Sequence, residues 1–210
     1  MKHGLSAFFF AATLLAGSAA FADETPSDET PAVASDDGMA GNVQFLLGQA
    51  YLGDFWKPFD RPSSFGVEVD FAPKKSPVRV ALAMNVFGDG ENVTSPYFGE
   101  TGSVGVGFLE FSAGFLWHPV KHGVARPYLG AGVLRMFAGV GAGSDFWIAG
   151  DSDQSFGYYG NAGIFFKVGD SFNIGIDGRF VGGTSITLAG LEGEADSSQV
   201  SLLLGFSWGE

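Results

Sequence analysis

Eight ionised side chains recur at alternate positions within otherwise apolar segments of the sequence. If residues 73–76 form a tight turn, Ala72 faces Pro77 and Asp70 faces Arg79, so we expect the last two side chains to form a salt bridge. Four acids and four bases balance, which predicts paired charges in a buried setting. The candidate charge network comprises Glu68, Asp70, Glu110, Asp177, Arg79, Arg126, Lys167 and Arg179.

No pattern typical of catalysis or metal binding stands out. The sequence contains no Cys, which excludes a disulfide framework, a thiolate metal site and a Cys nucleophile. Residues 151–155 read DSDQS, like the start of a calcium-binding loop, but the twelfth position is Ala162 and not Glu. Pairs of Asp and Glu occur at no distinctive spacing. We therefore expect neither an enzyme nor a bound metal or cofactor.

Alternation of polar and apolar residues dominates the sequence after position 39, with no sustained helical periodicity. Phe65 and Val67 share one face of an extended segment, for example, while Glu68 and Asp70 share the other. The clearly alternating segments are 65–72, 78–86, 156–168, 172–180 and 199–208, and the less regular ones are 41–52, 103–117 and 126–137.

The connections between these eight predicted strands alternate between long and short. Such short connections cannot carry parallel crossovers, so neighbouring strands must be antiparallel. The sequence therefore predicts an all-β fold, an eight-stranded antiparallel up-and-down barrel over residues 39–210. The long, mostly acidic connections are 53–64, 88–102, 138–155 and 182–197, and the short ones are 73–77, 118–125 and 169–171.

Two kinds of eight-stranded barrel fit this pattern, a soluble lipocalin-type barrel and a transmembrane barrel. One face of the strands carries Phe, Val, Ile, Leu and Trp with almost no charge, whereas the other carries Gly, Ala, Ser, Asn and ionised groups. So many Phe side chains would overfill a narrow barrel, but they meet lipid at no cost when they point outward. The lipocalin Gly-x-Trp start is also missing, because residues 53–56 read GDFW. We expect a transmembrane barrel with a polar lumen plugged by side chains.

The first 38 residues differ from the rest of the chain. A basic start, the apolar run 5–16 and the small-x-small sequence at 20–22 predict a cleaved secretory signal peptide over residues 1–22. Residues 23–38 carry six acids and no base, which predicts a disordered acidic tail. With 23 acids, 11 bases and a net charge of −12, the whole chain is not expected to bind nucleic acid.

One segment resembles the R-P-Y-x-G-x-G strand of small bacterial outer-membrane β-barrel proteins, the OmpA/OmpX/OmpW-like porin group: residues 126–133 read RPYLGAGV. The last predicted strand is similar to their C-terminal assembly signal of alternating apolar residues that end in an aromatic. The resemblance implies the cell outer membrane of a Gram-negative bacterium, with a periplasmic N-terminus and extracellular long connections. It implies as partners the barrel-assembly machinery, outer-membrane lipid and lipopolysaccharide. The assembly-signal residues are Val200, Leu202, Leu204, Phe206 and Trp208.

Aromatic residues near the ends of the predicted strands are typical of the girdle that membrane proteins place at the lipid headgroups. Rings with one polar edge favour that zone, so we expect these side chains to point out of the barrel. The predicted girdle comprises Tyr51, Trp56, Trp117, Tyr128, Trp147, Tyr158 and Trp208.

The expected function is non-enzymatic, in envelope integrity or in surface interaction through four long acidic extracellular loops. A narrow passive channel for small solutes is the alternative, with the lumen charges as its selectivity path. A third possibility is a lipid-A-modifying enzyme, in which a His acts with a Ser at the outer rim. His118 and His122 fall in a predicted periplasmic turn, at the wrong end of the barrel for that chemistry.

Overall fold

The computed structural model describes residues 38–94, 101–120, 123–144 and 147–209, and gives only the backbone at 93–94, 101, 143–144 and 147–149. The predicted signal peptide and nearly all of the predicted acidic tail therefore lie outside the described residues. In the described part of the chain, no helix is long and apolar enough to cross a bilayer.

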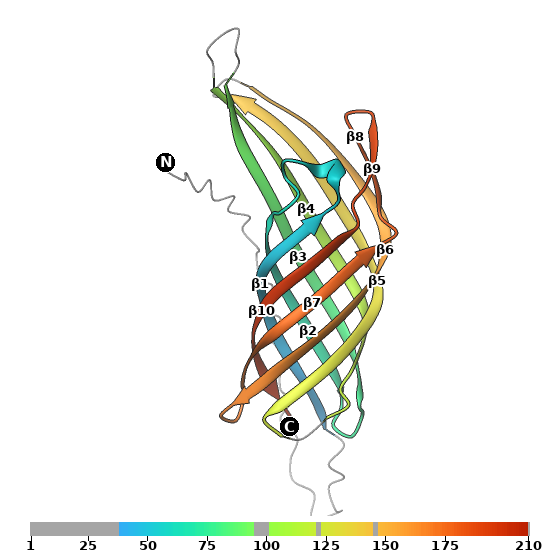
Figure 1. Cartoon of the computed structure of the whole chain (residues 1–210). Helices are drawn as coiled ribbons and strands as arrows, with labels where there is room; N and C mark the ends of the chain where they lie inside the picture. Colours follow the sequence, from blue (N-terminus) through green and yellow to red (C-terminus); the bar gives the residue numbers. More distant parts are fainter. Residues whose placement is uncertain (1–37, 95–100, 121–122, 145–146, 210) are drawn as a thin grey trace, which may run out of the picture. The chain divides into compact units, whose positions relative to one another are not determined.

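Eight antiparallel strands close into one barrel (Figure 1). The closing pair is the first and last barrel strand, β1 and β10, which leaves no open sheet edge through the body of the barrel. The predicted eight-stranded up-and-down barrel is confirmed. In chain order its strands are β1 (Met39–Leu52), β2 (Ser63–Pro73), β3 (Val78–Thr94), β4 (Thr101–Trp117), β5 (Ala125–Ser144), β6 (Trp147–Val168), β7 (Phe172–Gly182) and β10 (Ser197–Trp208).

The strands are strongly staggered around the barrel. A path along paired residues that leaves β1 at Asn42 returns to β1 at Leu52, ten residues further along the strand. A stagger of this kind is what tilts strands relative to a barrel axis. Side chains from strands far apart in the sequence can therefore meet at one level of the interior.

Alternation along the strands separates the two surfaces of the wall as expected. In β10, Val200, Phe206 and Trp208 are exposed on the outside, while Ser201 and Ser207 are buried inside. Strand β2 shows the same alternation, and its Phe65 is exposed on the outside. Four members of the predicted assembly signal, Val200, Leu202, Phe206 and Trp208, are exposed on the outer face, and Leu204 between them is half-buried.

Two of the predicted long loops are wrong. Strands β3 and β4 stay paired as far as Thr94 and Thr101, which accounts for most of the range 88–102. Strands β5 and β6 stay paired as far as Ser144 and Trp147, well inside the range 138–155. In Figure 1 these four strands reach beyond the others at one end of the barrel. Their glycine-rich sequence suggested loops, but backbone hydrogen bonds along three consecutive strand pairs hold them extended without help from large side chains.

The other two long connections carry short elements of their own at the same end of the barrel (Figure 1). Residues 53–64 include a 3₁₀ turn, η1 (Asp54–Trp56). Residues 182–197 include a hairpin of β8 (Ser185–Leu188) and β9 (Leu191–Glu194). Ala189 and Gly190 link its two strands with φ of 52° and 78°, the left-handed conformation that two-residue hairpin turns require.

Candidate functional site

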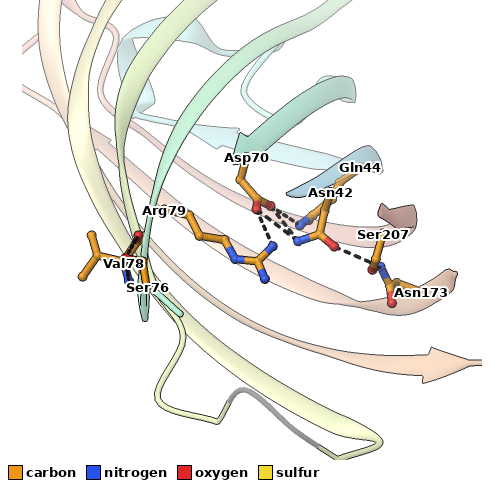
Figure 2. A network of polar contacts seen from close by, with 8 residues as sticks. All are labelled: Asn42, Gln44, Asp70, Ser76, Val78, Arg79, Asn173 and Ser207. Carbon is orange, nitrogen blue, oxygen red and sulfur yellow. Dashed lines mark hydrogen bonds and ion pairs between the residues drawn. The ribbon is translucent and has the colours of Figure 1, made fainter. Parts of the chain in front are cut away.

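The barrel interior is the candidate site, because the chemistry-bearing side chains converge there. One group lies at the end with the short turns. Asp70 on β2 accepts hydrogen bonds from Asn42 Nδ2 at 2.9 and 3.1 Å and from Gln44 Nε2 at 3.3 Å. Arg79 Nη1 lies 2.9 Å from Asp70 Oδ1, so the predicted salt bridge is present (Figure 2). Asp70 is fully buried, so its charge depends on these partners.

The register behind that pair differs from the prediction. Asp70 faces Ala81, not Arg79, because the connection between β2 and β3 is 74–77 and not 73–76. Ser76 fixes this connection, since its Oγ donates to the Val78 carbonyl at 2.6 Å and accepts the Val78 amide at 3.2 Å (Figure 2). The long arginine side chain reaches the carboxylate diagonally, which a shorter base could not do.

This cluster extends across the barrel through Asn173 on β7. Its Nδ2 donates to Ser207 Oγ at 2.6 Å and, at 3.4 Å, to Asn42 Oδ1 (Figure 2). Five strands, β1, β2, β3, β7 and β10, thus meet in one polar layer, which we call the Asp70 layer. No single strand sequence reveals such a layer, although Asn42 and Asn173 both occupy the polar positions of their alternating segments.

A second polar group lies nearer the end with the long strands. Arg179 on β7 forms an ion pair with Glu110 on β4, and both side chains are buried. Asn85 Nδ2 donates to the same Glu110 oxygen at 3.1 Å. The Arg179 guanidinium also lies over the Tyr159 ring, 3.9 Å from its centroid. We call these four residues the Arg179 layer.

Glycines make room for these interior side chains. A Cβ on Gly132 would lie 2.7 Å from Tyr159 Cε1, and one on Gly114 would lie 2.5 Å from the Tyr159 hydroxyl. Gly114 and Gly132 face each other across β4 and β5, so the Tyr159 ring lies against bare backbone. The abundance of glycine therefore has a packing role inside the wall as well as in turns.

Asp177 on β7 belongs to a third group. It accepts hydrogen bonds from the Tyr128 hydroxyl at 2.7 Å and from Asn161 Nδ2 at 3.3 Å. A Cβ on Gly163 would fall 2.4 Å from that hydroxyl, so glycine is needed there too. Glu68 is also buried, and its Oε2 accepts no hydrogen bond from the described residues.

Two apolar clusters share the interior with the polar groups, which corrects the expectation of a polar lumen. One includes Leu46, Leu116 and Leu203, and it also contains Tyr128, whose hydroxyl donates to Asp177. The other, at the end with the long strands, includes Ile186 and Leu188 of β8. Large apolar side chains fit inside because glycine, alanine and serine occupy so many of the other inward positions.

Two of the predicted girdle residues, Trp56 and Tyr128, are wrong, because their side chains are buried inside and do not point out of the barrel. Trp56 is 6% exposed inside the second apolar cluster, where its Nε1 donates to the Glu194 carbonyl at 2.7 Å. Tyr128 is 2% exposed and points at Asp177. Both rings gain a buried hydrogen bond that the headgroup zone would not give them. The remaining girdle residues Tyr51, Trp117, Tyr158 and Trp208 are exposed on the outer face, and the side chain of Trp147 lies outside the described residues.

The other candidate residues lie at the short-turn end. Arg126 is buried and Lys167 is half-buried, both at inward-facing positions. His118 is buried with its ring 5.8 Å from that of Tyr128, and His122 lies outside the described residues. Within the described chain, no three His, Asp or Glu side chains are arranged to hold a metal ion.

A ladder of side chains attaches the β8–β9 hairpin to the wall. The amides of Ser185, Thr187 and Ala189 donate to side-chain oxygens of Ser155, Asp153 and Asp151, at 3.0, 2.7 and 2.7 Å respectively. These acceptors lie two residues apart on β6, so side chains replace the backbone ladder of a normal strand pair.

Acid should loosen this attachment. The amides of Thr187 and then Gln154 hold the pKa of Asp153 below its ordinary value, so the contact is complete above about pH 4 and is lost as pH falls through the lowered pKa. With phenylalanine at the other three tryptophans, we expect Trp56 emission to shift to the red in acid. In Asp153→Asn the amide oxygen still accepts the hydrogen bond, so the shift should shrink. An equal acid shift in both proteins would contradict this role of Asp153.

Comparisons with known proteins agree with this architecture. No family model and no curated protein matches the chain. Among solved structures, Ail of Yersinia pestis, in complex with the heparin analogue sucrose octasulfate, matches with a TM-score of 0.58 and 13% identity over 81% of this chain and 99% of that chain. The chain has the fold of the small outer-membrane β-barrels. OprG from Pseudomonas aeruginosa shares this barrel fold at a TM-score of 0.57 and 13% identity, over 82% of this chain and 98% of that chain. Neisserial surface protein A shares it at a TM-score of 0.51 and 13% identity, over 82% and 97%.

Proposed function

We propose that the chain is a non-enzymatic outer-membrane protein whose lumen is sealed by side chains and whose work is done at its outer surface. The outer face supports the location. Phe115, Val133, Ile176 and Phe206, on four different strands, are each more than half exposed. A closed wall with so many exposed apolar side chains is stable where acyl chains cover it.

The filled interior is the observation that carries the sealed lumen. The interior holds the Asp70 layer, the Asp177 group, the Arg179 layer and two apolar clusters, one of which includes side chains of the β8–β9 hairpin. Leu116, Leu203 and Met136 are each 0% exposed, as are Asp70 and Glu110. An ion would have to displace packed side chains and break the Asp70–Arg79 and Glu110–Arg179 ion pairs to cross.

The proposed orientation rests on the resemblance and on the extension of strands β3 to β6 at one end of the barrel. With a periplasmic N-terminus, the short turns lie in the periplasm and the extended strands of β3 to β6 lie outside the cell. Asp89, Glu91 and Glu192 are exposed at that end and make the outer surface acidic. We propose envelope integrity or surface interaction as its work. Lipid, lipopolysaccharide and the barrel-assembly machinery are its proposed partners.

Conductance in a planar bilayer tests the sealed lumen. We expect no discrete conductance steps from the refolded wild-type barrel. A variant in which an Asn-Gly turn replaces residues 184–195 should also show no conductance steps. The Arg179 and Asp70 layers remain in the barrel after the hairpin is removed. A gel shift on boiling would show that each sample holds a folded barrel. Regular steps from the folded wild type would favour the narrow channel instead.

Lipid A composition tests the non-enzymatic part of the proposal. His118 lies at the short-turn end, buried against Tyr128 and Phe165, away from the outer leaflet. We expect lipid A from cells with and without the protein to have the same mass. An altered acyl pattern that depends on expression would contradict the proposal.

A further inference from the structure

One basic residue, Arg135, lies on the lipid-facing surface of the barrel wall. In the described parts of the eight barrel strands, Arg135 on β5 is the single charged residue at an outward-facing position, and its neighbours on that face are Val133 and Phe137. Two bases inside the barrel, Arg79 and Arg179, behave differently, since each pairs with a carboxylate. An unneutralised charge on an apolar surface is costly unless an anion approaches it from the membrane.

Two rings and one amide hold the Arg135 guanidinium. Its carbon lies 5.1 Å from the ring centroid of Phe137 and 5.2 Å from that of Phe156. Its Nη2 donates to Gln154 Oε1 at 2.6 Å. Arginine has five N–H donors in a planar fork, so the one hydrogen bond to Gln154 leaves donors that a ligand can use. Among the described residues, no carboxylate forms an ion pair with it.

The position of Arg135 along the wall matches a boundary between acyl chains and headgroups. Among the side chains that the structure describes, Phe156 and Phe137 are the last bulky ones at outward positions of β5 and β6. Beyond them on β5 and β6 the outward positions are Gln154, Ser152 and Gly139. The guanidinium turns towards Gln154, that is, towards the end with the long strands, as a snorkelling side chain does.

We propose that Arg135 and Gln154 bind the phosphate of an anionic lipid in the leaflet on the side of the long strands. The guanidinium donates to two phosphate oxygens, and the Gln154 amide nitrogen donates to a third while its oxygen keeps the contact with Arg135. The acyl chains of the lipid lie along the Phe137 and Phe156 side of the wall. The acidic surface beyond repels free anions, so the phosphate is one that the membrane itself delivers. This site rests on the proposed outer-membrane location.

Retention of a defined lipid tests the site. Folded wild-type protein in detergent micelles is mixed with diphosphoryl lipid A, and native mass spectrometry measures the bound fraction. We expect Arg135→Gln to weaken retention about tenfold, because a charge-assisted contact is lost. Lipid retention by Arg135→Lys should lie between that of the wild type and that of Arg135→Gln, since an ammonium cannot make the forked contact. Arg61→Gln is the matched control, an exposed base on the connection 53–64, and should retain lipid like the wild type.

Further measurements distinguish a lipid phosphate from free inorganic phosphate. They also distinguish failure of the Arg135 site from failure of the proposed function. Millimolar inorganic phosphate should not displace the lipid, and dipalmitoyl phosphatidylcholine should not be retained. Equal retention by wild type and Arg135→Gln, or displacement by inorganic phosphate, would overturn the site. The gel shift on boiling shows whether each variant is folded. Loss of the site with a non-conducting folded barrel would leave the proposed function standing.

Discussion

Replacing Arg179 with leucine is expected to lower the free energy of unfolding by about 3–5 kcal/mol, because it leaves the Glu110 carboxylate buried without its ion partner. The Tyr159 ring also loses the cation that covers it. The urea concentration at which half of the protein loses its heat-dependent gel shift measures the change. The midpoint for Arg179→Leu should fall well below that of the wild type.

Two control variants separate charge from packing in this experiment. The double variant Glu110→Gln with Arg179→Leu should recover part of the loss, because no uncompensated charge remains inside. Lys57→Gln removes an exposed pair with Asp54 and should leave the midpoint unchanged. If Arg179→Leu matched Lys57→Gln, the Arg179 layer would contribute nothing to stability.

Gly132→Val is expected to prevent closure of the barrel. A Cβ at this position would lie 2.2 Å from the Ala113 carbonyl oxygen and 2.7 Å from Gly114 Cα, which are backbone atoms that cannot turn aside. The Tyr159 ring also lies 2.7 Å away. We expect a cost of about 3 kcal/mol or more, since β4 and β5 must separate to relieve the overlap. After refolding, boiled and unboiled samples should migrate alike.

Gly107→Val is the matched control for this substitution. Gly107 lies on β4, the strand next to that of Gly132, but a Cβ there meets nothing within 4 Å. Valine favours strands, so this variant should refold as well as the wild type. Normal refolding of Gly132→Val would show that the wall tolerates a side chain where the structure leaves none.

The wall of the barrel is readable from the sequence because alternation is a local property. Phe65 and Val200 follow a period of two and point outward as expected. The salt bridge between Asp70 and Arg79 was also within reach, since only four residues separate strands β2 and β3. The strand extensions were missed because glycine lacks a side chain whose alternation could mark a strand.

The interior could not be read in the same way, because its contacts join distant strands. Phe165 and Tyr128 are bulky residues, yet they fit inside next to Gly175 and Gly163. Neither ring can be assigned to the interior until the partner glycine is known, and the partner depends on strand register. The stagger of the whole barrel sets that register. A glycine at an inward position opposite an aromatic residue is the signal that would have assigned the Phe165 and Tyr128 rings to the interior.

The β8–β9 hairpin is joined to β6 by side chains and not by a backbone ladder. Its amino-acid sequence is therefore free to drift, or to lengthen at Ala189 and Gly190, without any change in how the wall strands are aligned. Ile186 and Leu188 are the anchors that such variation must preserve. In the proposed orientation, the turn at Ala189 and Gly190 between β8 and β9 is an insertion point for displaying a foreign epitope.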